Sequence, residues 1–80
     1  MPSPDLETLT VRLQGRDFSF KSLPENRELL ISAAAELDKQ LEQLRQKNRM
    51  ASLEQAAVLV AINLYAEKQR LIAQDNFLLN

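Results

Sequence analysis

The side chains that could do chemistry in this chain are charged ones, because it contains no histidine and no cysteine. The commonest general base, the usual activator of a nucleophile and every thiolate metal ligand are therefore missing. A single glycine, Gly15, also excludes a glycine-rich phosphate loop. Carboxylates and lysines could still catalyse, but none are arranged in a pattern that suggests it. We therefore predict a protein that is not an enzyme, uses no cofactor or metal, and acts by binding.

Five charged residues are candidates for contacting a partner. Arg45, Lys47 and Arg49 stand at alternate positions around the end of a predicted helix, and Arg16 belongs to a predicted turn. Glu54 begins the next predicted helix. Each also has a purely structural interpretation, since exposed turns often carry charge and helix ends attract compensating charges. The residue types alone leave both interpretations open.

Composition limits the class of partner. Eighty residues make one small domain, and an apolar fraction of 45% is enough for a core. The net charge of −1 and the pI of about 5.3 provide no positive field that would attract nucleic acid or an anionic membrane. No signal peptide is visible, and the apolar run 56–62 is far shorter than the roughly 20 residues that span a bilayer. We expect a cytoplasmic protein that binds neither nucleic acid nor membrane.

Two strands should come first in the chain. Apolar and polar residues alternate over 8–14 and again over 17–21, which is typical of strands with one buried face. A two-residue loop at 15–16, with glycine first, suits a type II′ hairpin turn. This loop places Leu13 opposite Phe18, on the same face. Because an isolated hairpin is marginally stable, its apolar face should rest on a helix.

Two helices should follow the hairpin. Ser22 with Glu25, and later Ser52 with Gln55, match the capping box that starts a helix. The first helix should end within 46–48, and the second should continue nearly to the end of the chain. The apolar residues of the first helix are spaced alternately by four and three: Leu30, Ala34, Leu37, Leu41 and Leu44.

The second helix has an unusual apolar block over 56–65. It is apolar on every side and contains one amide, Asn63. Such a helix must be covered from several directions, and the rest of so small a chain has too few residues to cover it on every side. We therefore expect a second copy of the chain, with Asn63 fixing the register of the pair. The expected oligomer interface comprises Leu37, Leu41, Leu44, Val60, Asn63, Leu64 and Leu71.

This order of elements, and several short motifs within it, resembles the ZapA family of bacterial cell-division proteins. The motifs are Val11-Arg12-Leu13-Gln14-Gly15-Arg16, Pro24-Glu25-Asn26-Arg27, Ala33-Ala34-Ala35-Glu36-Leu37-Asp38-Lys39-Gln40-Leu41, Ser52-Leu53-Glu54-Gln55 and Ala61-Ile62-Asn63-Leu64. The resemblance implies an α+β fold, with an N-terminal β-hairpin followed by two α-helices. The second helix would be long and coiled-coil-like, and the chains would pair through the helices as a homodimer or homotetramer.

The resemblance also implies a function. Family members bind FtsZ, a tubulin-like GTPase, and cross-link or align its protofilaments at the mid-cell division site, without catalysis. Contacts with other division-ring proteins are also compatible with it. Arg16, Arg45, Lys47 and Arg49 match basic positions of the family and Glu54 an acidic one, so FtsZ, whose surface is acidic in character, is expected to bind there.

The resemblance suggests three parts in the chain. They are a flexible tail over 1–7, a head over 8–66, and a coiled-coil extension over 67–80. Because family members usually continue for several more helical turns, we expect this extension to be truncated or naturally short.

Two other interpretations stay open from the sequence. One is a small dimeric DNA-binding protein of the strand-helix-helix type, although the acidic pI and the self-pairing second strand count against it. The other is a generic helical dimerisation scaffold, which differs from the first interpretation only in its partner.

Overall fold

The computed structural model describes the backbone of residues 5–79 and the side chains of residues 5–72. Residues 1–4 of the expected tail lie outside this range, as do the side chains of the extension beyond residue 72. The elements, in order, are β1 (Glu7–Leu13), β2 (Arg16–Ser22), the short 3-10 turn η1 (Pro24–Asn26), α1 (Arg27–Lys47) and α2 (Leu53–Leu79). The predicted α+β fold, a hairpin followed by two helices of which the second is longer, is confirmed.

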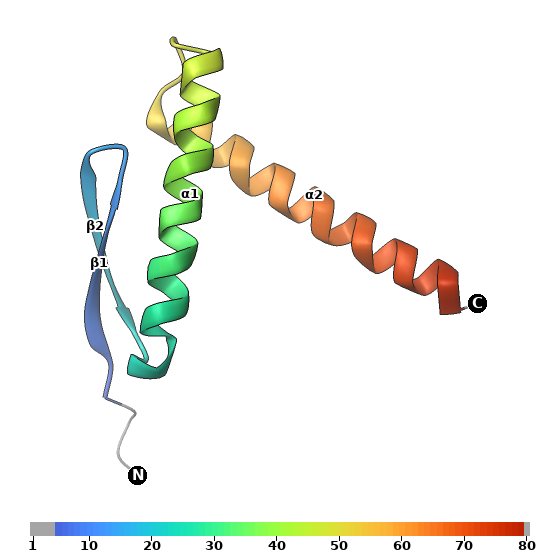
Figure 1. Ribbon diagram of the computed structural model, residues 1–80, viewed down its shortest axis with the longest axis horizontal. Helices are drawn as coiled ribbons and strands as arrows, with labels where there is room; N and C mark the ends of the chain where they lie inside the picture. The colour runs from blue at the N-terminus through green and yellow to red at the C-terminus, as the bar shows by residue number, and fades with distance from the viewer. Residues whose placement is uncertain (1–4, 80) are drawn as a thin grey trace.

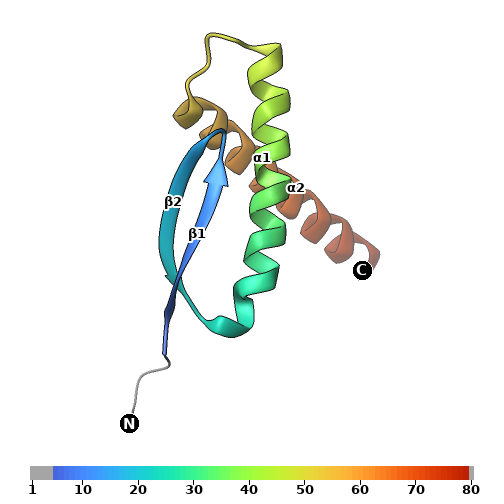
Figure 2. The same cartoon turned by 60° about the vertical axis from the view of Figure 1, so that its left-hand side comes forward.

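The hairpin lies along α1, whereas α2 crosses the C-terminal half of α1 and then projects away (Figures 1 and 2). The radius of gyration is 16.3 Å. A compact chain of this length would have a radius of about 12 Å, so the molecule is markedly extended. The far part of α2 therefore receives little cover from the rest of its own chain.

The predicted pairing of the two strands is wrong by two residues. Val11, and not Leu13, lies opposite Phe18, while Leu13 lies opposite Arg16. Both registers place the same apolar residues on the same face of the hairpin, so the alternating pattern could not distinguish them. The prediction that this face rests on a helix is confirmed for β1, which packs on α1, whereas Phe18 and Phe20 of β2 on the same face are exposed.

The loop of the hairpin consists of Gln14 and Gly15, and Arg16 is already the first residue of β2. Both loop residues have positive φ angles, 52° for Gln14 and 78° for Gly15. Two such residues define a type I′ turn, in place of the predicted type II′ turn. Glycine adopts this conformation freely, but Gln14 needs contacts elsewhere to hold it there.

The buried core residues form two groups along α1. On the hairpin side, Leu9 and Val11 of β1 are buried. On the α2 side, Leu41 is fully covered and packs with Ala56 and Val60. Four partly buried leucines surround this second cluster: Leu13, Leu37, Leu44 and Leu53. The helical seam predicted from the sequence thus serves mainly to join the three elements of a single chain.

The two predicted capping boxes have different outcomes. Ser22 does not cap a helix, because it pairs with Glu7 as the last residue of β2, and η1 separates it from α1, whose N-cap is Asn26. The second box is confirmed. The Gln55 backbone N–H donates to Ser52 Oγ, and the Ser52 N–H donates to Gln55 Oε1, both at 3.1 Å.

Candidate partner-binding surface

Hydrogen bonds between Gln14 and Asp38 hold the tip of the hairpin against the middle of α1. The Gln14 backbone N–H donates to Asp38 Oδ1 at 2.7 Å, and Gln14 Nε2 donates to the same oxygen at 2.8 Å. Nε2 also lies 3.2 Å from the Asp38 backbone oxygen. These bonds hold Gln14 in its left-handed conformation. They also lower the pKa of Asp38, the backbone N–H of Gln14 contributing most and its side chain next.

Arg45 lies beside the hydrogen bonds between Gln14 and Asp38. Its Nη1 donates to Gln14 Oε1 at 3.4 Å, so a side chain near the end of α1 contacts the hairpin tip. Arg45 and Arg49 line one shallow hollow of about 330 Å³, together with Gln14, Glu42 and Gln46. The structure therefore brings two of the predicted basic residues together.

Arg16 extends this region onto β2. It directly follows the turn residues, and its Cζ lies 5.6 Å from the centroid of the Phe18 ring. This is a cation–π contact, worth about 0.5–1 kcal/mol at an exposed site. We call the region formed by Gln14, Arg16, Arg45 and Arg49 the tip surface.

Lys47 and Glu54 lie outside the tip surface. Lys47 stands two positions after Arg45, which is about 200° around a helix. It lines a different hollow, of about 270 Å³, with Lys39 and Asn63. Glu54 lies at the rim of an apolar groove near the start of α2. The five predicted contact residues thus occupy three separate places.

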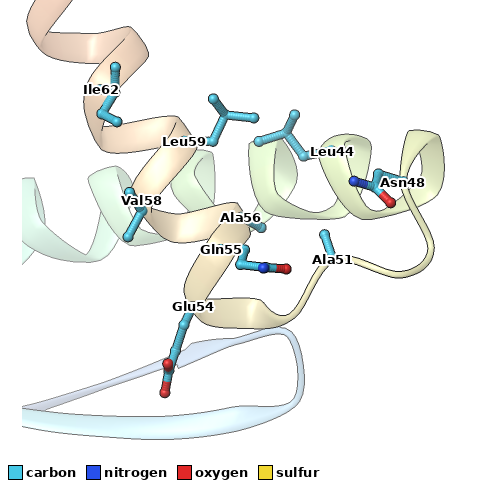
Figure 3. Close-up of a pocket in the computed structure, with 9 residues that line it drawn as sticks. All are labelled: Leu44, Asn48, Ala51, Glu54, Gln55, Ala56, Val58, Leu59 and Ile62. Carbon is cyan, nitrogen blue, oxygen red and sulfur yellow. The ribbon is translucent and has the colours of Figure 1, made fainter.

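The apolar groove has a volume of about 610 Å³ and lies between the end of α1 and the first turns of α2 (Figure 3). In Figure 3 the side chains of Leu44 and Leu59 face each other, Ala51 lies on the loop that joins the two helices, and Ala56 lies near the start of α2. The lining residues are Leu44, Asn48, Ala51, Glu54, Gln55, Ala56, Val58, Leu59 and Ile62. The sequence did not predict a groove here, because it forms only when the two helices cross.

The exposed apolar surface continues along α2 beyond this groove. Val58 and Ile62 also line a second shallow hollow with Tyr65, which is 66% exposed. An apolar surface of this extent usually marks an interaction site.

The residues expected at an oligomer interface fall into two groups. Leu41 and Val60 are buried within the chain, at 0% and 3% exposure, and Leu37 and Leu44 are half-buried. The exposed residues of the expected interface are Asn63, Leu64 and Leu71. The first group therefore stabilises the packing of one chain, and the second is free to meet a partner. Asn63 is exposed in the single chain, so its predicted role in fixing a register stays a prediction.

Sequence reasoning missed Gln14 and Asp38 as members of a site. A residue before Gly15 in a hairpin loop is a signal for a turn, but Gln14 finds its acceptor 24 positions later. Neither residue type nor local spacing indicates that contact.

The structure is that of a small α+β protein with a charged tip surface and separate exposed apolar side chains along α2. Over the described residues, no helix is long and apolar enough to cross a membrane. The model of a family described as Cell division protein ZapA matches residues 9–78. The chain belongs to this ZapA family, whose members are non-enzymatic and associate with FtsZ in cell division. Comparison with curated proteins gave no match, and comparison with solved structures gave none.

Proposed function

We propose that this protein binds FtsZ protofilaments through the tip surface and aligns or cross-links them at the mid-cell division site in the cytoplasm. A symmetric oligomer, assembled through α2, would carry at least two tip surfaces. The observation that carries the proposal is the separation of the two surfaces. The basic residues gather where the hairpin tip meets α1, whereas the exposed apolar residues follow α2. Both surfaces can therefore be occupied at the same time.

The charges of the tip surface suit an acidic partner. Arg16 and Arg49 are exposed, and Arg45 is half-exposed beside Gln14. Arginine presents a planar group that can bind a carboxylate through two parallel hydrogen bonds. Positive charges at such a surface increase the rate of encounter and fix the orientation of the partner. Lys47 and Glu54 would contribute only if the contact extended around the end of α1.

Assembly through α2 would make this weak charged contact effective. Once one tip surface of an oligomer is bound, the second meets a neighbouring protofilament at a high effective concentration. The exposed residues Asn63, Leu64 and Leu71 would form the oligomer contact, whereas Leu41 and Val60 are buried within one chain.

Co-sedimentation with FtsZ tests this function. FtsZ is polymerised with GTP and pelleted in the presence of the wild-type protein. A parallel sample with GDP in place of GTP controls for pelleting that does not depend on polymer. An Arg45→Glu/Arg49→Glu variant removes the paired positive charges of the tip surface. A Lys21→Glu/Arg27→Glu variant makes the same change in net charge at exposed positions at the opposite end of the hairpin, outside both the tip surface and α2.

We expect polymer-dependent pelleting of the wild type and of the Lys21→Glu/Arg27→Glu control, and its loss in the Arg45→Glu/Arg49→Glu variant. If both variants pellet equally, FtsZ binding stands and the tip surface is the wrong site. If the folded wild-type protein does not pellet with polymer at all, the proposed function itself is wrong.

A further inference from the structure

We propose that Gln14 and Asp38 are positioning residues of the tip surface, which hold the guanidinium of Arg45 ready for an acidic partner. This inference rests on the proposed function. It gives two residues without a positive charge, Gln14 and Asp38, a role in recognition.

The orientation of the Gln14 amide is fixed by the chemistry of Asp38. An ionised carboxylate can only accept hydrogen bonds, so the NH₂ group of Gln14 must face it. The carbonyl oxygen, Oε1, then faces Arg45, whose guanidinium can only donate. In the reversed orientation the Gln14 oxygen would face the Asp38 carboxylate, and the Gln14 NH₂ group would face the Arg45 guanidinium. Acceptor would then oppose acceptor, and donor would oppose donor. Asp38 thus determines which end of the Gln14 amide Arg45 meets.

The backbone of the turn supports the same arrangement. The Gln14 N–H donates to Asp38 at 2.7 Å, so the main chain and the side chain of Gln14 are held by one carboxylate. The side chain of Gln14 therefore has little freedom to move away from Arg45. A long arginine side chain loses rotamer freedom when it binds, and an orientation present before binding reduces that loss.

The neighbours of Arg45 on its own helix do not replace Gln14. Glu42 and Gln46 line the same hollow, but they bond to each other, with Gln46 Nε2 donating to Glu42 Oε1 at 3.1 Å. Across the part of the chain whose side chains are described, the hydrogen-bond acceptor of Arg45 is Gln14 Oε1.

Gln14→Gly separates this positioning role from a role in folding. Glycine adopts the positive φ of this turn freely and keeps the backbone N–H that donates to Asp38, but it lacks the amide that donates to Asp38 and meets Arg45. Relief of the left-handed conformation of Gln14 offsets part of the loss of its side-chain bonds to Asp38, so we expect the midpoint of thermal unfolding to fall by no more than a few degrees. FtsZ polymer should nevertheless bind about three- to tenfold more weakly, as expected for the loss of one contact in a coupled network.

Asp38→Ala tests the second residue through its coupling to Arg45. We measure the affinity for FtsZ polymer of Asp38→Ala, Arg45→Ala and the double variant. If Asp38 acts through Arg45, the double variant binds no more weakly than Arg45→Ala alone. If Asp38 had a purely structural role, the double variant would bind more weakly than Arg45→Ala by the amount that Asp38→Ala alone loses. Thr10→Ala is the matched control, because it removes an exposed hydrogen bond to Ser19 elsewhere in the hairpin. It should bind as the wild type does.

The outcomes distinguish this inference from the function on which it rests. Weaker binding by Gln14→Gly, together with the non-additive result for Asp38, supports the positioning role. Wild-type affinity of Gln14→Gly, or an additive loss in the double variant, overturns it while FtsZ binding stands. If the wild-type protein does not bind polymer, the proposed function fails with it.

Discussion

The Gln14 backbone N–H and Asp38 Oδ1 form a 2.7 Å hydrogen bond that joins the hairpin turn to α1 across 24 positions of sequence. The rest of the hairpin contacts α1 mainly through apolar side chains of β1, whereas its tip is fixed by a charged acceptor. Hydrogen bonds to a carboxylate are directional and strong, so this one determines the position of the turn as well as its stability.

The pH dependence of stability should reveal this bond. The pKa of Asp38 in the folded protein lies below its usual value of 3.8, so folding favours the ionised form. The contribution of Asp38 is therefore complete above about pH 5 and is lost progressively as the pH falls below 3.8 and through the lower folded pKa. Urea denaturation between about pH 2 and pH 6 should show a steeper acid loss for the wild type than for Asp38→Asn. Parallel curves for the two proteins would contradict this prediction.

The reciprocal hydrogen bonds of Ser52 and Gln55 should hold the start of α2. Ser52→Ala removes the Oγ that accepts from the Gln55 N–H, and it should lower the free energy of unfolding by about 1 kcal/mol. Ser32→Ala is the control, because Ser32 is exposed within α1 and alanine favours a helix interior. Chemical denaturation of both variants checks the prediction. An equal effect at the two positions would show that the cap does not stabilise the fold.

The fully buried Leu41 should be the most sensitive position of α1. Its truncation to alanine leaves a cavity against Ala56 and Val60, which should cost about 2–5 kcal/mol. Leu29 lies on the same helix but is 69% exposed, and Leu29→Ala should change the stability by less than about 0.5 kcal/mol. Denaturant midpoints of the two variants provide the measurement. A small effect at Leu41 would mean that the two helices do not pack as described.

Features set by a regular period could be predicted from the sequence. Alternation predicted the face of β1 that holds Leu9 and Val11, and the spacing of four and three predicted the seam that includes Leu41. The register in which β1 pairs with β2 could not be predicted in this way, because a shift of two residues leaves every side chain on the same face of the hairpin. The contact between Gln14 and Asp38 selects a position for the turn that strand periodicity alone could not predict.

The candidate site could be predicted only in part, for a related reason. Arg45 and Arg49 both lie near the predicted end of α1, and the structure brings them into one hollow. Lys47 falls on the other side of the helix, as the helical period of 3.6 residues requires, so proximity in sequence was misleading. The place of Gln14 in this hollow depends on the hairpin packing against α1, which no local pattern encodes.

An exposed amide within an apolar surface should influence how the chains associate. Asn63 precedes Leu64 on α2, lines a hollow with Lys39 and Lys47 of α1, and is exposed in one chain. If a second chain covers it, its amide must find a partner there, which favours one register. Asn63→Leu should keep the helical content but give a broader distribution of oligomers in sedimentation velocity. A single sharp species identical to that of the wild type would contradict this role.

Leu64 should report on association more than on the folding of one chain. It is 52% exposed, so a single chain gains little from it. If α2 is covered by a partner, Leu64→Ala removes apolar area from that contact, and the unfolding midpoint should become lower and more dependent on protein concentration. Thermal unfolding at several concentrations tests this, with Leu29→Ala as an exposed leucine outside α2. A shift below about 1 °C at every concentration would mean that no partner covers Leu64, because even a loss of 1 kcal/mol moves the midpoint of so small a domain by several degrees.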